Sequence, residues 1–166
     1  MSAKEYKKII LEKIGETLKE RKFKKKGNEF SGSNGEMTYY ISVQSSLSST
    51  TDILKFTVNT EIASELISKF DDTSLSKEKQ RHYTRRIGTY LKEQQDKWWT
   101  VNNVDSATKA AKEIVEIIIN QIIPTFGTLK TTQDLAALWR TGGYMGVTES
   151  QRRNYLGLID KNMSLI

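Results

Sequence analysis

Few side chains in this sequence of 166 residues are of the types that usually carry out catalysis. There is no cysteine, and the single histidine, His82, would have to serve any Ser-His-Asp triad, although no nearby serine lies in a G-x-S-x-G turn. The adjacent acids Asp71 and Asp72 lack a third acid at helical or strand spacing, as a Mg²⁺ site would need. The pattern therefore favours a partly exposed strand histidine, a solvated acidic loop and no metal.

Phosphate-binding motifs are also incomplete. Residues 127–132 contain a glycine, a lysine and threonines, but not the G-x-x-x-x-G-K-[ST] spacing that lets backbone amides surround a phosphate. The sequence thus predicts a protein without a cofactor that binds rather than catalyses. An enzyme that uses carboxylates together with Arg86 in a concave pocket remains open as a different class.

Two adjacent tryptophans, Trp98 and Trp99, stand in the segment DKWWTV. Neighbouring side chains of a strand point to opposite faces of the sheet, and Val101 shares the face of Trp99. We therefore expect Trp99 on the core face of the sheet and Trp98 on the opposite, second face, where packing in the core does not explain the presence of a tryptophan.

The second face of the predicted sheet gathers aromatic, arginine and amide side chains, a composition typical of recognition surfaces. The candidate binding residues are Trp98, Arg86, Asn59, Gln44, Tyr40 and Lys97. The alternative is an ordinary polar sheet face that the C-terminal helices partly cover.

The net charge of +6 is unevenly distributed. Residues 1–30 carry ten basic and five acidic side chains, and residues 76–100 carry seven and three. The preferred hypothesis is a protein partner bound through the second face. The alternative is nucleic acid bound by segments 19–26 and 81–86, with Trp98 stacked on a base; the phosphate contacts would be Lys24, Lys26, Arg81 and Arg86. The basic residues also fit a simpler interpretation as solvated side chains.

Membrane association is not predicted. No run approaches the roughly 18 apolar residues that a membrane span needs, and the first 20 residues lack the apolar region of a signal peptide. We expect a cytoplasmic protein.

The elements that would position these residues follow from periodicity. Residues 3–22 have the spacing of an amphipathic helix. Asn34 and Gly35 predict a tight hairpin that pairs Phe30 with Tyr39, with a bulge or late strand start at Gly27. Residues 37–44 and 53–62 alternate as strands of an antiparallel sheet covered on one face.

The later elements are predicted in the same way. Residues 81–91 fit a strand or a helix, and their composition favours a strand; residues 97–101 form the next one. A helix should run from an N-cap at Asp105 to about residue 123, where Pro124 ends it. Two more helices should follow capping boxes, Thr131 with Asp134 and Thr148 with Gln151. The prediction is one α+β domain over residues 1–166, with an N-terminal helix, about five antiparallel strands and C-terminal helices on one face.

Several motifs occur in the order typical of a bacterial family. They are Phe23-Lys24-Lys25-Lys26-Gly27-Asn28-Glu29-Phe30, Val43-Gln44-Ser45-Ser46, Phe56-Thr57-Val58-Asn59, Arg86-Ile87-Gly88, Asp96-Lys97-Trp98-Trp99 and Ile123-Pro124-x-Phe126. Over about residues 5–140 the chain resembles domain of unknown function 4304, although Thr60-Glu61 stand where the family pattern has Leu-Gly. Residues 141–166 would be a helical extension.

The resemblance implies no established activity and no catalytic residue. By analogy with similar small bacterial domains, it suggests an immunity or partner-binding role.

Overall fold

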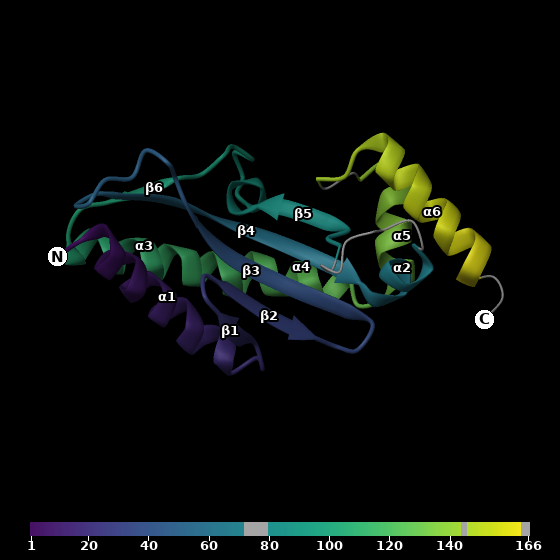
Figure 1. The fold of residues 1–166 in the computed structure, drawn as a ribbon, viewed down its shortest axis with the longest axis horizontal. Helices are drawn as coiled ribbons and strands as arrows, with labels where there is room; N and C mark the ends of the chain where they lie inside the picture. Colours follow the sequence, from purple (N-terminus) through teal and green to yellow (C-terminus); the bar gives the residue numbers. More distant parts are fainter. Residues whose placement is uncertain (72–79, 144–145, 164–166) are drawn as a thin grey trace.

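The computed structural model has the predicted α+β fold and describes residues 1–71, 80–143 and 146–163 (Figure 1). The strands are β1 (Lys24–Lys26), β2 (Glu29–Ser33), β3 (Met37–Ser45), β4 (Leu54–Ser64), β5 (Tyr83–Arg86) and β6 (Trp99–Val101). The helices are α1 (Ala3–Lys19), α2 (Glu65–Phe70), η1 (Ile87–Tyr90), α3 (Val104–Ile117), η2 (Ile118–Ile122), α4 (Ile123–Thr128), α5 (Thr132–Arg140) and α6 (Glu149–Met163).

Helix α1 begins at a capping box formed by Ser2 and Glu5. Its buried stripe consists of Tyr6, Ile10, Leu11, Ile14 and Leu18. The helix ends earlier than predicted because the chain turns at Lys22, whose φ is 64°, and the N–H of Phe23 donates to the carbonyl of Leu18.

The strands form one antiparallel sheet in which β1, β2, β3 and β4 are successive neighbours. The other edge of β4 pairs with β6 over residues 54–56 and with β5 over residues 59–62. The sheet has six strands rather than about five because Gly27, with φ of 62°, makes a turn instead of a bulge and separates β1 from β2. The shared edge of β4 brings the segments around residues 86 and 98 to the same part of the sheet.

The turn between β2 and β3 lies one residue later than predicted. Phe30 pairs with Ile41 rather than with Tyr39. The N–H of Asn34 donates to the carbonyl of Met37 at 3.1 Å, and the side chain of Asn34 accepts a hydrogen bond from the N–H of Met37 at 2.8 Å, so the turn residues are Gly35 and Glu36 rather than Asn34 and Gly35. The shift of two residues leaves every side chain on its predicted face.

The two faces of the sheet differ in composition. The core face packs against α1 and α3, and its buried apolar residues are Phe30, Met37, Ile41, Val43, Leu54, Phe56, Val58 and Ile62 (Figure 1). We call the opposite side the outer face; it carries Tyr40, Gln44, Asn59 and Arg86. Strand alternation therefore assigned the faces correctly.

The outer face is less open than predicted. Its buried residues, each at most 8% exposed, are Thr38, Tyr40, Thr57 and Ala63. The guanidinium carbon of Arg81 lies 3.2 Å from the ring centroid of Tyr40, and the Thr57 hydroxyl donates to the carbonyl of Lys97 at 2.6 Å. The segments before β5 and before β6 thus cover parts of this face, while Gln44 remains exposed and Asn59 partly exposed.

The predicted strand over residues 81–91 is a strand only as far as Arg86, where η1 begins. In η1, a Cβ added at Gly88 would overlap the carbonyl oxygen of Gln95 and lie 2.7 Å from the backbone nitrogen of Lys97. Gly88 therefore allows η1 to pack directly against the backbone that leads to Trp98.

The long helical run after β6 differs from the prediction at both ends. Its N-cap is Asn103, not Asp105, because the Asn103 side chain accepts from the N–H of Ser106 at 2.7 Å. Pro124 does not end it. The π-helical segment η2 inserts an extra residue into one turn, which accommodates a proline that has no N–H to donate, and α4 continues beyond it.

Helices α5 and α6 pack around the end of the sheet where β4 passes into α2 (Figure 1). Both predicted capping boxes are confirmed: Thr131 with Asp134, and Thr148 with Gln151. The Tyr155 ring of α6 lies 5.0 Å from the His82 ring and 5.6 Å from the Trp139 ring of α5. The C-terminal helices are thereby attached to the sheet through aromatic contacts.

Candidate functional site

Four of the candidate residues lie on the three neighbouring strands of the outer face. The register aligns Ser42, Asn59 and Arg86 across β3, β4 and β5. The Asn59 amide donates to the side-chain oxygen of Gln44 at 2.7 Å. Tyr40 lies further along β3, opposite Glu61.

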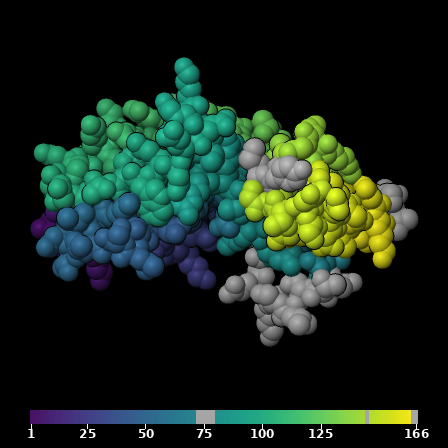
Figure 2. All heavy atoms as spheres, turned by 90° about the horizontal axis from the view of Figure 1, so that it is seen from above, coloured from purple at the N-terminus to yellow at the C-terminus, as the bar shows by residue number. Residues whose placement is uncertain are grey.

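Trp98 adjoins these strands and is surrounded by charged groups. Its indole N–H donates to Asp96 at 2.9 Å, and the ring centroid lies 5.2 Å from the guanidinium carbon of Arg86 and 5.9 Å from Nζ of Lys55. We call Lys55, Arg86, Asp96 and Trp98 the Trp98 cluster. Figure 2 shows the segments that build it side by side at the surface, with residues 85–100 in teal beside the β3–β4 region in blue. Cations within about 6 Å of an indole are attracted to its face, so this contact orients both charges around the ring.

The Trp98 cluster has an excess of positive charge. Arg86 and Lys55 face one acid, Asp96, and the Arg86–Asp96 separation of 3.7 Å is too long for a hydrogen bond. Nη1 of Arg86 is buried and has no hydrogen-bond partner among the described residues. The Arg86 side chain is 38% exposed, so the rest of its guanidinium can donate hydrogen bonds to an acceptor from outside.

A second group of charges on the outer face is more nearly balanced. Arg81 lies between Tyr40 and Glu29, with its Nη2 3.5 Å from the Glu29 carboxylate. Burial raises the pKa of Glu61, the positive charge of Arg81 opposes that rise, and the Glu29 charge adds to it. Two carboxylates and one guanidinium therefore share this region, which makes it less suited to an anion than the Trp98 cluster.

Two candidate residues are not available as predicted. Tyr40 is on the outer face but only 6% exposed, because Arg81 covers its ring. The side chain of Lys97 lies on the other side of the chain, with its Nζ 5.4 Å from the Trp99 ring centroid. Both residues precede β6, which begins at Trp99 rather than at residue 97 as predicted, and their side chains point to different sides of the chain.

Trp99 is in the core, as the sequence predicts. It is 7% exposed, its ring stacks on Phe56 at 5.6 Å, and its N–H donates to Glu113 at 2.8 Å. Of the two adjacent tryptophans, Trp98 is therefore on the outer face and Trp99 is in the core.

His82 is fully buried, so the expectation of a partly exposed histidine is wrong. The backbone N–H of Ser64 donates to its Nδ1 at 2.8 Å. Burial lowers the pKa of His82 to about 4, which keeps the ring neutral. His82 binds the backbone at the end of β4 and packs against Tyr155 of α6, and it does not belong to the Trp98 cluster.

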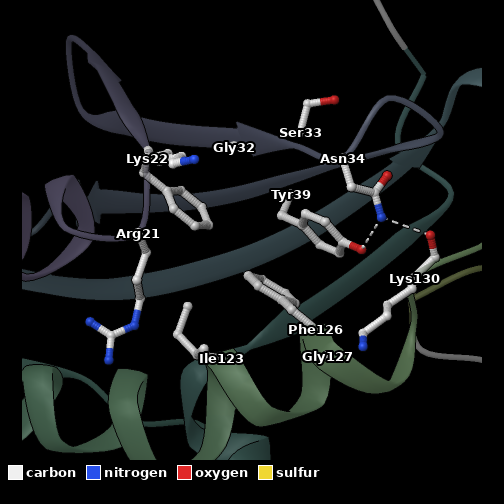
Figure 3. Close-up of a pocket in the computed structure, with 11 residues that line it drawn as sticks. Arg21, Lys22, Gly32, Ser33, Asn34, Tyr39, Ile123, Phe126, Gly127 and Lys130 are labelled. Carbon is white, nitrogen blue, oxygen red and sulfur yellow. Dashed lines mark hydrogen bonds between the residues drawn. The ribbon is translucent and has the colours of Figure 1, made fainter.

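A groove that the sequence did not predict lies on the other side of the sheet, at the β2 edge (Figure 3). It has a volume of about 410 Å³ and runs between the end of α1, the β2–β3 hairpin and α4. Its walls include Phe23, Tyr39 and Phe126, and Tyr39 donates its hydroxyl proton to the carbonyl of Leu129 at 2.7 Å. Burial raises the pKa of Tyr39 to about 12, helped by the charges of Asp134 and Glu36, so the hydroxyl stays protonated. No periodicity could reveal this groove, because it joins segments about a hundred residues apart.

Two residues of the Trp98 cluster, Asp96 and Lys55, were not among the candidates that the sequence pattern indicated. Asp96 stands two residues before Trp98, and Lys55 is an outward residue of an alternating strand. Their positions were therefore visible in the sequence, but their approach to Trp98 depends on the β4–β6 pairing.

Within residues 1–71, 80–143 and 146–163 the structure offers neither a cluster of metal ligands nor a membrane-spanning helix. No group of three or more His, Cys, Asp or Glu side chains there could hold a metal ion; Asp72, one of the two adjacent acids, is outside the described residues. None of the helices in these ranges has the length and apolar character needed to cross a bilayer.

Comparison with known proteins gives one match. The profile of a family described as Domain of unknown function (DUF4304) matches residues 14–128, more than two thirds of the chain, and confirms the resemblance found in the motifs. No curated protein and no solved structure matches.

Proposed function

We propose, for this chain that belongs to the DUF4304 family, a non-catalytic binding function: the Trp98 cluster on the outer face holds an acidic segment of a protein partner. The observation that carries the proposal is the partly exposed Trp98 ring between two cations, with one of them, Arg86, incompletely paired within the described residues.

The chemistry of these residues supports an acidic partner. Tryptophan and arginine are the residues that most often dominate binding energy at protein interfaces. The planar guanidinium of Arg86 can bind a carboxylate through two N–H groups, and its side chain is 38% exposed. Asn59 and Gln44 lie beside it and offer neutral hydrogen-bonding groups, which are suited to a peptide backbone.

The position of His82 supports binding over catalysis. The only imidazole of the sequence is inside the fold with its Nδ1 occupied by the N–H of Ser64. It is thus not placed to exchange protons with a molecule on the outer face.

The test begins with capture of partners from a bacterial extract, with the wild-type protein and a Trp98→Ala, Arg86→Ala variant used in parallel. The affinity of each purified candidate is then measured by isothermal titration calorimetry. We expect the double variant to bind at least about thirtyfold more weakly, a loss of about 2 kcal/mol, which removal of even one central aromatic or arginine residue can cause.

A Lys109→Ala, Ile119→Ala variant is the matched control, because both residues are exposed on the helical run of α3 and η2, away from the outer face. Circular dichroism must show that both variants are folded. Unchanged affinity of the folded Trp98→Ala, Arg86→Ala protein for every captured partner would sink the proposal.

Nucleic acid is the competing outcome of this test. Arg81 of the second basic segment extends across the outer face to within 3.5 Å of Glu29, which pairs with Lys26 of the first, so a carboxylate separates the cations of the two segments. This arrangement favours the protein partner. Binding of single- or double-stranded oligonucleotides at about 50 mM salt that weakens steeply with added salt would instead support the nucleic-acid alternative.

A further inference from the structure

We propose that the groove between the end of α1, the β2–β3 hairpin and α4 binds a small amphipathic anion, a molecule with an aromatic or other apolar body and an acidic head group. This site is separate from the Trp98 cluster and does not depend on the function proposed for it. Its volume of about 410 Å³ is within the range of small-molecule sites.

The walls of the groove are suited to an apolar body. Phe23, Tyr39, Ile123 and Phe126 line it, and the rings of Tyr39 and Phe126 are 4.9 Å apart and tilted by 34°. Figure 3 shows Tyr39, Ile123 and Phe126 around a common space. The Phe23 ring lies flat on β2, since a Cβ added at Gly32 would be only 3.2 Å from it. The small residue at position 32 thereby leaves room for an aromatic wall at the sheet edge.

The rim of the groove is suited to an acidic head group. Arg21 and Lys22 stand at one end and Lys130 at the other (Figure 3). Among the described residues that line the groove, none has a carboxylate. The positive charges of Arg21, Lys22 and Lys130 attract an anion whose apolar body lies in the groove, and they repel a cation of the same shape.

The groove is held in shape by hydrogen bonds between distant segments. The Asn34 amide donates to the carbonyl of Lys130 at 2.8 Å and to the Tyr39 hydroxyl at 3.3 Å, and that hydroxyl donates to the carbonyl of Leu129. The hairpin is therefore tied to the end of α4. A preformed site loses less conformational freedom when a ligand binds.

Two fluorescent probes with nearly the same aromatic body test the proposal. The probe 8-anilino-1-naphthalenesulfonate is anionic, and N-phenyl-1-naphthylamine is its neutral counterpart. We expect one site per chain for the anionic probe and weaker binding of the neutral one. Each of the reversals Lys130→Glu and Arg21→Glu should weaken the anionic probe about threefold to tenfold and leave the neutral probe nearly unchanged.

A blocking variant tests the location. Gly127 lines the groove, and a Cβ added there meets nothing within 4 Å, so Gly127→Leu fills space without a clash at Cβ. It should weaken both probes by roughly tenfold or more, as expected when an occupied pocket is filled. Gly157→Leu in α6 is the matched control, because position 157 is equally unobstructed and far from the groove in sequence. Lys109→Glu controls for net charge.

Equal affinity of the two probes, or anionic-probe binding that Gly127→Leu and the two charge reversals leave intact, would overturn the proposal. The folded Trp98→Ala, Arg86→Ala variant should keep the wild-type affinity for the anionic probe. If this variant lost affinity for the anionic probe, the probe would bind at the outer face, and the proposal of a site in the groove would be refuted. Failure of the partner experiment, by contrast, leaves the probe results unchanged, so the two proposals fail separately.

Discussion

His82 is held inside the fold as a neutral imidazole. Its Nδ1 accepts from the N–H of Ser64, so the proton is on Nε2, 3.4 Å from the side-chain oxygen of Gln80. Burial lowers the pKa to about 4 and outweighs the charges of Asp71 and Glu65, which raise it. Between the ordinary pKa of 6.5 and this lowered pKa, the unfolded chain binds the proton and the folded chain does not. Stability is therefore lost as the pH falls through this window, and His82 has no such effect above it.

We expect His82 to lower the free energy of unfolding by about 3 kcal/mol between pH 6.5 and pH 4, at about 1.4 kcal/mol per pH unit of pKa difference. His82→Asn keeps an acceptor for Ser64 and has no titrating ring. Its stability at pH 7 should be lower because the contact with Tyr155 is lost, but its decline with acid should be shallower. Urea unfolding at a series of pH values measures both slopes. Parallel declines in the two proteins would contradict the assignment to His82.

At the scale of elements, the position of Trp98 depends on the packing of η1 against residues 95–97. Gly88 is the contact point, since an added Cβ would overlap the Gln95 carbonyl. The same backbone carries Asp96 and Trp98. The contact therefore determines where the Trp98 cluster stands relative to β4.

Gly88→Ala should lower the free energy of unfolding by about 2–4 kcal/mol, because backbone atoms, unlike a flexible side-chain end, have to move. Gly127→Ala is the control: its Cβ meets nothing, and replacing a helical glycine should stabilise by up to about 1 kcal/mol. Chemical denaturation measures both. Equal stabilities of the two variants would show that residues 95–97 can move away from an added Cβ at little cost, and that Gly88 does not determine the position of this segment.

Strand alternation predicted the faces of β3 and β4, and with them the outer position of Asn59. Alternation alone left the face of Arg86 open, and Trp98 precedes β6, which begins at Trp99. Faces survive errors of register because a shift of two residues, as in the Phe30 hairpin, preserves parity. The misplaced features, the N-cap at Asn103 and the loop closed by Asn34, depend on individual side-chain hydrogen bonds that composition leaves open. The burial of Tyr40 and the groove arise from contacts between distant segments, which no local pattern records.

At the scale of the whole molecule, α6 is attached to the rest of the chain through Tyr155. Its ring lies against His82, beside β5, and stacks on Trp139 of α5. The residue is 7% exposed, and Trp139 is fully buried. This arrangement motivates the proposal that residues 1–166 unfold as one unit.

Tyr155→Ala should reduce the free energy of unfolding by about 3–5 kcal/mol, the range for removing a buried aromatic side chain. Tryptophan fluorescence and far-ultraviolet circular dichroism should report one coincident transition in the wild-type protein. Asn154→Ala, an exposed neighbour on α6, is the control and should change little. An early step that removes part of the circular dichroism and only part of the tryptophan signal would instead make α5 and α6 a separately unfolding part.

The π-helical segment η2 makes the length of the helical run as important as its composition. A π-turn holds one more residue than an α-turn in about the same rotation, so deleting one residue of η2, such as the exposed Asn120, would restore a regular helix while leaving Phe126 on the side of Tyr39. It would also bring Pro124 into a regular α-helical turn. Deletions and insertions are usually confined to loops, but here one extra residue inside a helix allows the helix to continue through Pro124 to the groove wall.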